Sequence, residues 1–207
     1  MTITTIAHLL THELKHTNIE LKGWVRTFRA NRFIALNDGS CLQNIQCVVD
    51  FESMDDRLLK RITTGAAVHI KGSLVDSQGK GQSVEIKVSS VEILGDADPE
   101  EVSKTILQPK RHSLEFLREQ SHLRARTNTF SAVMRLRSSL SFAIHSYFNK
   151  NGFYYMHAPI VTGSDAEGAG EMFRVTTLDA KNPPLNEDGM VDYSKDFFGK
   201  ETNLTVS

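Results

Sequence analysis

The sequence predicts an all-β barrel of five strands over its first hundred or so residues, followed by a mixed α and β region. Short segments of alternating apolar and polar residues recur in the first half, as expected of strands with one buried face. Beyond residue 127, apolar residues recur at three- and four-residue steps, which is typical of a helix. Hydrophobic residues are 40% of the chain and charged residues 24%, proportions that disfavour a disordered chain or a coiled coil.

Five segments have the composition of strands: 19–29, 32–38, 44–50, 66–75 and 83–94. The first alternates most clearly, because Ile19, Leu21 and Val25 share one face. In the last segment the parity changes between Val88 and Val91, which predicts a β-bulge.

A short helix is expected between the third and fourth strands. Residues 53–62 begin with Ser53 as a candidate N-cap and carry Asp55 in the first turn. Three strands, a helix and two more strands within residues 1–98 follow the element order expected of the oligonucleotide/oligosaccharide-binding barrel, the OB-fold.

The predicted barrel carries residue types suited to nucleic acid. OB-folds bind single strands by stacking bases on aromatic rings and holding the backbone with basic side chains. The candidates cluster around the first hairpin and the third strand: Arg26, Arg29, Arg32, Phe28, Phe33 and Gln46. The alternative is that Phe33 is a core residue and Gln46 an ordinary surface residue, because a fold does not determine a function.

The net charge of −1 excludes a histone-like protein but conceals opposed segments. Residues 99–150 carry a net charge of +5 and residues 151–207 a net charge of −5. The basic segment is interpreted either as solvated helix faces or as a phosphate-contacting connector between two folded units.

The second half divides into a connector and a further domain. Residues 95–112 hold two X-Pro pairs and no sustained periodicity, which predicts a linker followed by a short helix or extended arm. A helix is expected over 128–149, stopped by Gly152. The expected domains are therefore a barrel at 1–98, a hinge at 99–126 and a second domain at 127–207.

Two strand-like segments, 153–162 and 197–207, flank a polar region of the second domain. Pro159 lies in the first of them, and since proline cannot donate to a β-ladder it belongs at an edge or an interface.

The loop 163–175 is rich in glycine and in carboxylates. Gly168 and Gly170 allow the backbone to approach a ligand closely. The carboxylates of Asp165 and Glu167, with that of Glu171, are suited to an ammonium group or a metal. A plain polar loop is the alternative, and the absence of a GK[ST] ending excludes a phosphate loop.

Cysteine usage and the termini favour a soluble, cytoplasmic protein. Cys41 and Cys47 form neither a disulfide framework nor a zinc site, and no metal ligands are expected. The first residues lack the layout of a signal peptide, and no apolar run approaches the roughly 20 residues of a membrane span.

Several segments match a known family: 22–26 (KGWVR), 110–119 (KRHSLEFLRE), 122–127 (HLRART), 163–175 (GSDAEGAGEMFRV) and 191–201 (VDYSKDFFGKE). Together they resemble the bacterial asparaginyl-tRNA synthetases, class II enzymes of the aspartate, asparagine and lysine subgroup. The stretches EGAGEMF and DFFGKE are specific, whereas GWVR alone indicates only the subgroup.

The resemblance implies an enzyme that joins asparagine to ATP and then to its tRNA, with Mg²⁺ as cofactor. It implies a second domain built on an antiparallel sheet with helices, and a homodimer whose interface includes Pro159. The glycine-rich loop resembles the flipping loop that closes on the amino acid, with Ser164, Asp165, Gly168 and Gly170 in it. Glu167 matches the glutamate that binds the α-ammonium group of asparagine.

In the barrel, the resemblance assigns the anticodon to four residues. Phe33 matches the aromatic residue that stacks on the middle anticodon base, and Gln46 the amide that reads that uridine. Arg29 matches a basic partner nearby, and Arg26 is assigned to the same surface.

One departure from the family pattern is large. The second and third signature motifs, which hold ATP and magnesium, have no counterpart in the 207 residues. The resemblance therefore identifies the chain as an N-terminal portion with a truncated catalytic domain, with no catalytic residue and no adenylate formation by this chain alone. Two alternatives stay open: an aspartate-charging relative, which EGAGEMF disfavours, and a stand-alone OB-fold that binds single-stranded nucleic acid.

Overall fold

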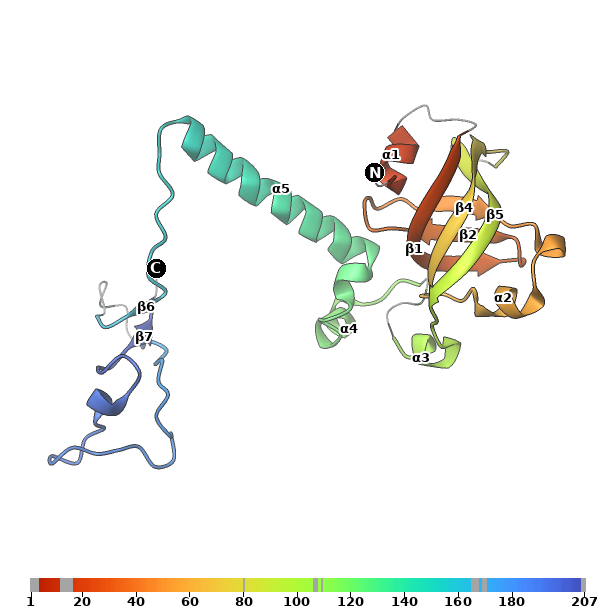
Figure 1. Cartoon of the computed structure of the whole chain (residues 1–207). Coiled ribbons are helices and arrows are strands. Elements are labelled where there is room, and N and C mark those ends of the chain that lie inside the picture. The colour runs from red at the N-terminus through yellow and green to blue at the C-terminus, as the bar shows by residue number, and fades with distance from the viewer. Residues whose placement is uncertain are drawn as a thin grey trace. The chain divides into compact units, whose positions relative to one another are not determined.

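The computed structural model of the chain (Figure 1) describes residues 4–11, 17–79, 81–105, 108, 110–164, 168 and 171–205. Two compact units divide it, Met1–Phe142 and Ala143–Ser207. Within the described residues, no helix combines the length and the apolar character needed to cross a membrane.

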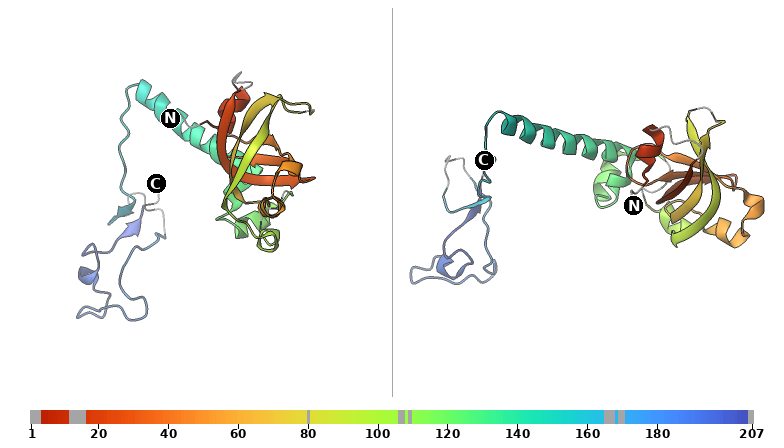
Figure 2. Two further views of the ribbon diagram at one scale, coloured as in Figure 1. Left: turned by 45° about the vertical axis from the view of Figure 1, so that its right-hand side comes forward. Right: turned by 45° about the horizontal axis from the view of Figure 1, so that its top comes forward.

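The first unit is built on a closed barrel of five strands, ordered β1-β2-β3-β5-β4. The strands are β1 (Asn18–Arg29), β2 (Phe33–Asn37), β3 (Ile45–Val48), β4 (Ala67–Asp76) and β5 (Val84–Gly95). β3 and β5 run parallel and close the barrel, while every other neighbouring pair is antiparallel. The predicted five-stranded OB barrel is confirmed, and Figures 1 and 2 show its strands curving around a common interior.

The barrel core follows from the alternation in the sequence. On β2, Ile34 and Leu36 are fully buried while Phe33 lies on the outer face. The core also includes an element that the sequence analysis missed, α1 (Ile6–Thr11), whose Ile6 and Leu9 are buried with the barrel residues. The backbone N–H of Ile6 donates to Asp38 Oδ2 at 2.8 Å, which holds α1 against the turn after β2.

The predicted bulge in β5 is confirmed at Ser89. The ladder pairs Lys71 with Ser90 but the next residue, Gly72, with Val88, so Ser89 is the extra residue. A side chain at Gly72 would place its Cβ only 2.3 Å from the carbonyl oxygen of Lys87. Glycine is therefore required at this close approach of β4 and β5.

The helix after β3 begins later than predicted. It is α2 (Asp56–Arg61), and Asp55 caps it by accepting a hydrogen bond from the backbone N–H of Arg57 at 2.8 Å. The expected cap, Ser53, instead ends a 3-10 helix, η1 (Phe51–Ser53). The Ser53 hydroxyl donates to the Asp50 carbonyl at 2.9 Å.

The connector between the barrel and the long helix holds more regular structure than its composition predicts. It contains α3 (Pro99–Ser103), α4 (Leu114–Glu119) and the 3-10 helix η2 (Arg124–Arg126). Asp98 caps α3 by accepting from two backbone N–H groups, with proline in the first turn. α4 agrees with the short helix expected after the linker, whereas α3 was not predicted because five residues are too few to show a clear apolar period.

The expected long helix is α5 (Asn128–Lys150), which ends as predicted before Gly152. Gly152 has a φ of +86°, in the left-handed region. None of its 23 residues is buried. It is drawn as one continuous helix in every view (Figures 1 and 2).

The second unit has less β structure than predicted. Within the described part of this unit, only Val161–Thr162 (β6) and Asn203–Leu204 (β7) form strands, paired antiparallel with each other. The predicted strand over 153–162 is wrong for residues 153–160, which are exposed and have no partner strand among the described residues. Apolar composition favours a strand but does not supply the neighbour that a strand requires. The 3-10 helix η3 (Tyr193–Lys195) lies in the same unit.

Candidate nucleic-acid interface

Three of the four residues predicted to meet an anticodon lie together on the outer face of the barrel. Arg29 pairs with Phe33 across β1 and β2, while Ala35 pairs with Gln46 across β2 and β3. Arg29, Phe33 and Gln46 line one hollow of about 310 Å³, which we call the base pocket. The remaining residues of its lining are Thr27, Ala35 and Gly79.

Phe33 is an aromatic residue of the surface and not of the core. Its side chain is 37% exposed, so the interpretation of Phe33 as a core residue is wrong. The guanidinium carbon of Arg32 lies 5.6 Å from the ring centroid, a cation–π contact. An exposed ring beside two arginines is the arrangement that single-strand binders use to stack a base and hold its phosphate.

The Gln46 amide is held in one orientation by Glu85. Gln46 Nε2 donates to Glu85 Oε2 at 3.2 Å, and the Ser77 hydroxyl donates to the same oxygen at 2.9 Å. With Nε2 turned toward Glu85, the other side of the amide presents its carbonyl oxygen, an acceptor, while Nε2 keeps a second N–H. An acceptor here complements the N3–H of uracil. Neutral cytosine has no hydrogen at N3.

Glu85 and Ser77 are functional candidates that the sequence analysis missed. Gln46 and Glu85 are separated by 39 positions and meet because β3 and β5 pair in parallel. A polar residue on the outer face of a strand is ordinary, so only knowledge of that pairing would have indicated Glu85.

Arg26, the fourth predicted residue, lies in a different hollow. Its Nη1 donates to the Arg126 carbonyl oxygen at 2.9 Å and its Nη2 to Asn128 Oδ1 at 3.4 Å. Burial lowers the pKa of Arg26, and the positive charge of Arg126 lowers it further. The ladder of β1 and β2 shifts register between Val25 and Thr27, and this bulge places Arg26 away from the base pocket.

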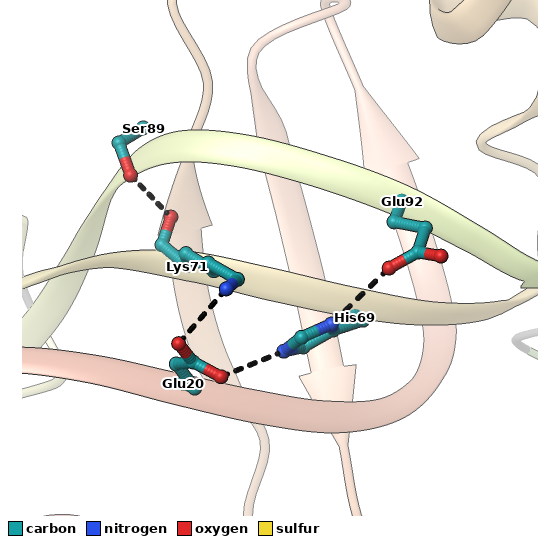
Figure 3. Close-up of polar contacts among 5 residues, drawn as sticks. All are labelled: Glu20, His69, Lys71, Ser89 and Glu92. Atoms are coloured by element: carbon teal, nitrogen blue, oxygen red, sulfur yellow. Dashed lines mark hydrogen bonds and ion pairs between the residues drawn. The ribbon is translucent and has the colours of Figure 1, made fainter.

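A second polar cluster crosses β1, β4 and β5 (Figure 3). His69 lies between Glu20 and Glu92, 3.3 Å from an oxygen of each, and Lys71 Nζ lies 2.9 Å from Glu20. The hydrogen bond from Lys71 lowers the pKa of Glu20. Because the two carboxylates are exposed and one is paired with a lysine, the cluster is an ion-pair ladder across three strands. The Ser89 hydroxyl also donates to the Lys71 carbonyl.

The predicted amino-acid site is only partly described. Asp165, Glu167 and Gly170 lie outside the described residues. Ser164 is exposed, and its N–H donates to the Thr162 hydroxyl at 3.2 Å. Gly168 has φ +60°, a left-handed conformation that favours glycine. Pro159 is exposed and lies outside the strands.

The surface of α5 and of the segment after it is unusually apolar. Large hydrophobic side chains between 40% and 90% exposed occur throughout: Val133, Met134, Leu136, Leu140, Phe142, Ile144, Tyr147, Phe148, Phe153, Tyr154, Tyr155, Met156 and Ile160. Large exposed apolar patches commonly mark interaction sites.

Two family models match the chain. The model described as "OB-fold nucleic acid binding domain" matches residues 19–94, and the one described as "tRNA synthetases class II (D, K and N)" matches residues 113–190.

Curated relatives match nearly the whole chain. An asparagine–tRNA ligase of Cytophaga hutchinsonii is 58% identical over 192 residues, which are 91% of this chain and 41% of the relative. One of Porphyromonas gingivalis is 54% identical over 207 residues, 99% of this chain and 44% of the relative. The chain therefore spans about two fifths of the length of these relatives.

Solved structures share the fold. The asparaginyl-tRNA synthetase of Pyrococcus horikoshii complexed with asparaginyl-adenylate aligns with a TM-score of 0.73 and 20% identity, over 100% of this chain and 43% of that one. The Entamoeba histolytica asparaginyl-tRNA synthetase aligns with a TM-score of 0.71 and 20% identity, over 94% of this chain and 41% of that one.

Proposed function

The chain belongs to the asparaginyl-tRNA synthetase family of class II synthetases, and on this premise we propose that it serves the ATP-dependent attachment of asparagine to its tRNA in the cytoplasm. Its barrel binds the tRNA anticodon. One observation carries this proposal: an exposed aromatic ring, a basic side chain and an oriented amide gather in the base pocket.

Each side chain of the base pocket has a separate task in this proposal. The Phe33 ring stacks on the middle anticodon base, and Arg29 holds the adjacent backbone. The Gln46 carbonyl oxygen accepts the N–H of uracil. The 3.2 Å hydrogen bond from Gln46 Nε2 to Glu85 keeps the amide turned for that contact. A cytosine at this position has no hydrogen at N3 for this partly buried acceptor, which weakens its binding.

Asparagine, ATP and Mg²⁺ are the proposed substrates and cofactor of the family reaction. Glu167 of the glycine-rich loop is the proposed ligand of the asparagine ammonium group, since a carboxylate holds a cation well. Among the described residues, no group of three His, Cys, Asp or Glu side chains is placed to hold a metal, so no step through Mg²⁺ is assigned to them. We expect that the 207-residue chain alone does not catalyse asparagine-dependent pyrophosphate exchange.

The apolar surface of α5 supports a homodimer. A helix of 23 residues without one buried side chain requires a partner to remove its apolar stripe from water. We propose that a second copy of the chain is this partner and that Pro159 lies at the interface.

Binding of an anticodon stem–loop RNA tests the proposed function. Fluorescence anisotropy with a loop that carries uridine in the middle position should show Phe33→Ala losing about 1–3 kcal/mol, the contribution of one stacked base. Phe51, which is 45% exposed and outside the base pocket, supplies the matched control, and Phe51→Ala should bind as the parent does.

The amide is tested by exchanging the middle base. Gln46→Ala should lower the preference of the parent chain for uridine over cytidine while leaving the cytidine loop bound about as before. Equal affinity of the parent chain for both loops would refute the reading role of Gln46, and unchanged binding by Phe33→Ala would refute the stacking role of Phe33.

A further inference from the structure

A second hollow of about 270 Å³ lies beside the first turns of α5, at the other end of the outer face of β2. Three arginines line it, Arg26 from β1, Arg126 from η2 and Arg135 from α5, and we call it the arginine pocket. We propose that the arginine pocket binds one backbone phosphate of the RNA strand whose bases lie in the base pocket. This inference rests on the proposed function and adds a contact site to it.

Among the residues that the structure describes, no carboxylate neutralises the arginine pocket. Its lining residues include no aspartate or glutamate, and none of the three arginines forms an ion pair within the described part of the chain. The carboxylate nearest along the chain, Asp38, accepts hydrogen bonds from the backbone N–H groups of Ile6 and Ser40. Three cationic groups around one hollow with no acidic residue in its lining favour an anion.

The three guanidinium groups are held in place before any ligand arrives. Arg26 is fixed by the Arg126 carbonyl and Asn128. Arg135 donates to the Ser40 carbonyl at 3.1 Å and also to the Gly39 carbonyl. The Arg126 guanidinium lies 5.0 Å from the ring centroid of Trp24. A planar fork fixed by carbonyls and a ring loses little entropy when it binds a tetrahedral oxyanion.

The position of the long helix adds to the attraction. Asn128 and Ser131, in the first turn of α5, line the same hollow. The N-terminus of a helix of 23 residues carries partial positive charge, which favours an anion beside it.

A continuous surface joins the two pockets. Phe33, Ala35 and Asn37 alternate with the buried residues of β2 and so share its outer face. Phe33 and Ala35 line the base pocket, while Asn37 lines the arginine pocket and pairs with Trp24. Four residues of strand span about 13 Å, a distance that a few nucleotides of an RNA strand cover. The phosphate is therefore expected a short way along the strand from the base on Phe33.

Arg126→Gln is the test with the least structural disturbance. Its side chain stacks on Trp24, while its backbone carbonyl, which Arg26 uses, is retained in the variant. Arg124 is the matched control because it stacks on Phe130 at 4.7 Å and does not line the arginine pocket. Arg126→Lys keeps the charge and should restore most of the binding.

The measurement is the affinity of the 207-residue chain for the stem–loop RNA across a range of salt concentrations. Loss of one phosphate contact should lower the slope of log K against log salt by about 0.7 and the affinity at 0.1 M salt about fivefold. Arg126→Gln should show both effects, equally for loops with uridine or cytidine in the middle, whereas Arg124→Gln should show neither. A melting temperature equal to that of the parent excludes unfolding as the cause.

The outcomes separate the two proposals. If the parent chain binds the stem–loop and Arg126→Gln keeps the full salt slope, the proposed phosphate site in the arginine pocket is wrong. The anticodon proposal is then unaffected. A loss of affinity without a change of slope assigns Arg126 to holding the barrel and η2 together, which also overturns the arginine pocket. A parent chain that does not bind the stem–loop overturns the proposed function and this inference with it.

Discussion

Asp196 is the best-connected side chain of the second unit. Only 8% of the residue is exposed, and its Oδ1 accepts from the backbone N–H groups of Thr177 at 2.9 Å and Phe197 at 2.8 Å. The Thr176 hydroxyl donates to its Oδ2. The Thr176 hydrogen bond, followed by the backbone N–H of Thr177, holds the pKa of Asp196 well below its ordinary value. The Asp196 carboxylate thus links residues 176–177 to residues 196–197.

This lowered pKa makes one contribution to the pH dependence of the stability of the unit. Because the folded pKa lies below the unfolded value, the ionised Asp196 contributes fully above that unfolded value, about 3.9, and its contribution is lost as the pH falls through the folded pKa. In NMR spectra recorded during acid titration, the amides of Thr177 and Phe197 should shift only well below pH 3.9. In Asp196→Asn this titration should vanish, and the unit should be less stable at neutral pH. A midpoint near the ordinary value would contradict the assignment.

At this scale the sequence indicated the candidate ligand-binding side chains better than the side chains that position them. Phe33 and Gln46 are the residue types that single-strand binding needs, and the strands that carry them, β2 and β3, were predicted correctly. Glu85 depends on a pairing between distant strands, and Asp196 on contacts to residues about 20 positions away. Arg26 lines another hollow than Arg29 and Phe33, a separation that alternation along a strand does not reveal where a bulge interrupts it.

At the scale of the elements, the close approach of β4 and β5 leaves no room for a side chain at Gly72. A Cβ at this position would lie 2.3 Å from the Lys87 carbonyl oxygen, a backbone atom that cannot turn away. Gly72→Ala should therefore lower the free energy of unfolding in urea by about 1–3 kcal/mol, the usual cost of overpacking. Gly95→Ala is the control, since its Cβ would meet only the Ala67 Cβ, at an ordinary 3.7 Å. Equal stability of the two variants would show that the strands separate easily.

Elements were predictable from the sequence where one face of them is buried. The five strands alternate because the barrel has one interior, and their positions were predicted to within a few residues. α3 was missed because five residues carry no period, and α1 because its two apolar residues gain meaning only beside the barrel. Residues 153–160 were assigned wrongly since their composition is that of a strand, whereas strand structure requires a neighbour.

At the scale of the whole molecule, the contrast between a well-packed barrel and an unburied long helix is the dominant feature. All five strands of the barrel contribute apolar side chains to a buried core, while α5 buries none. Along α5, Leu136, Leu140, Ile144 and Tyr147 recur at four- and three-residue steps and are all more than half exposed. Such a stripe is stable in water only when another surface covers it, which is the physical basis of the proposed homodimer.

Sedimentation of the 207-residue chain tests that proposal. The parent should associate to a dimer, and Leu140→Lys should raise the dissociation constant at least tenfold, because a buried leucine of an interface is replaced by a charge without a partner. Ser139→Lys adds the same charge to a neighbouring exposed position and should have a smaller effect if the stripe through Leu140 faces the partner. A parent chain that stays monomeric at high concentration would contradict self-association of this chain. Equal effects of the two lysines would instead indicate that repulsion between like charges, and not loss of the apolar contact, weakens the dimer.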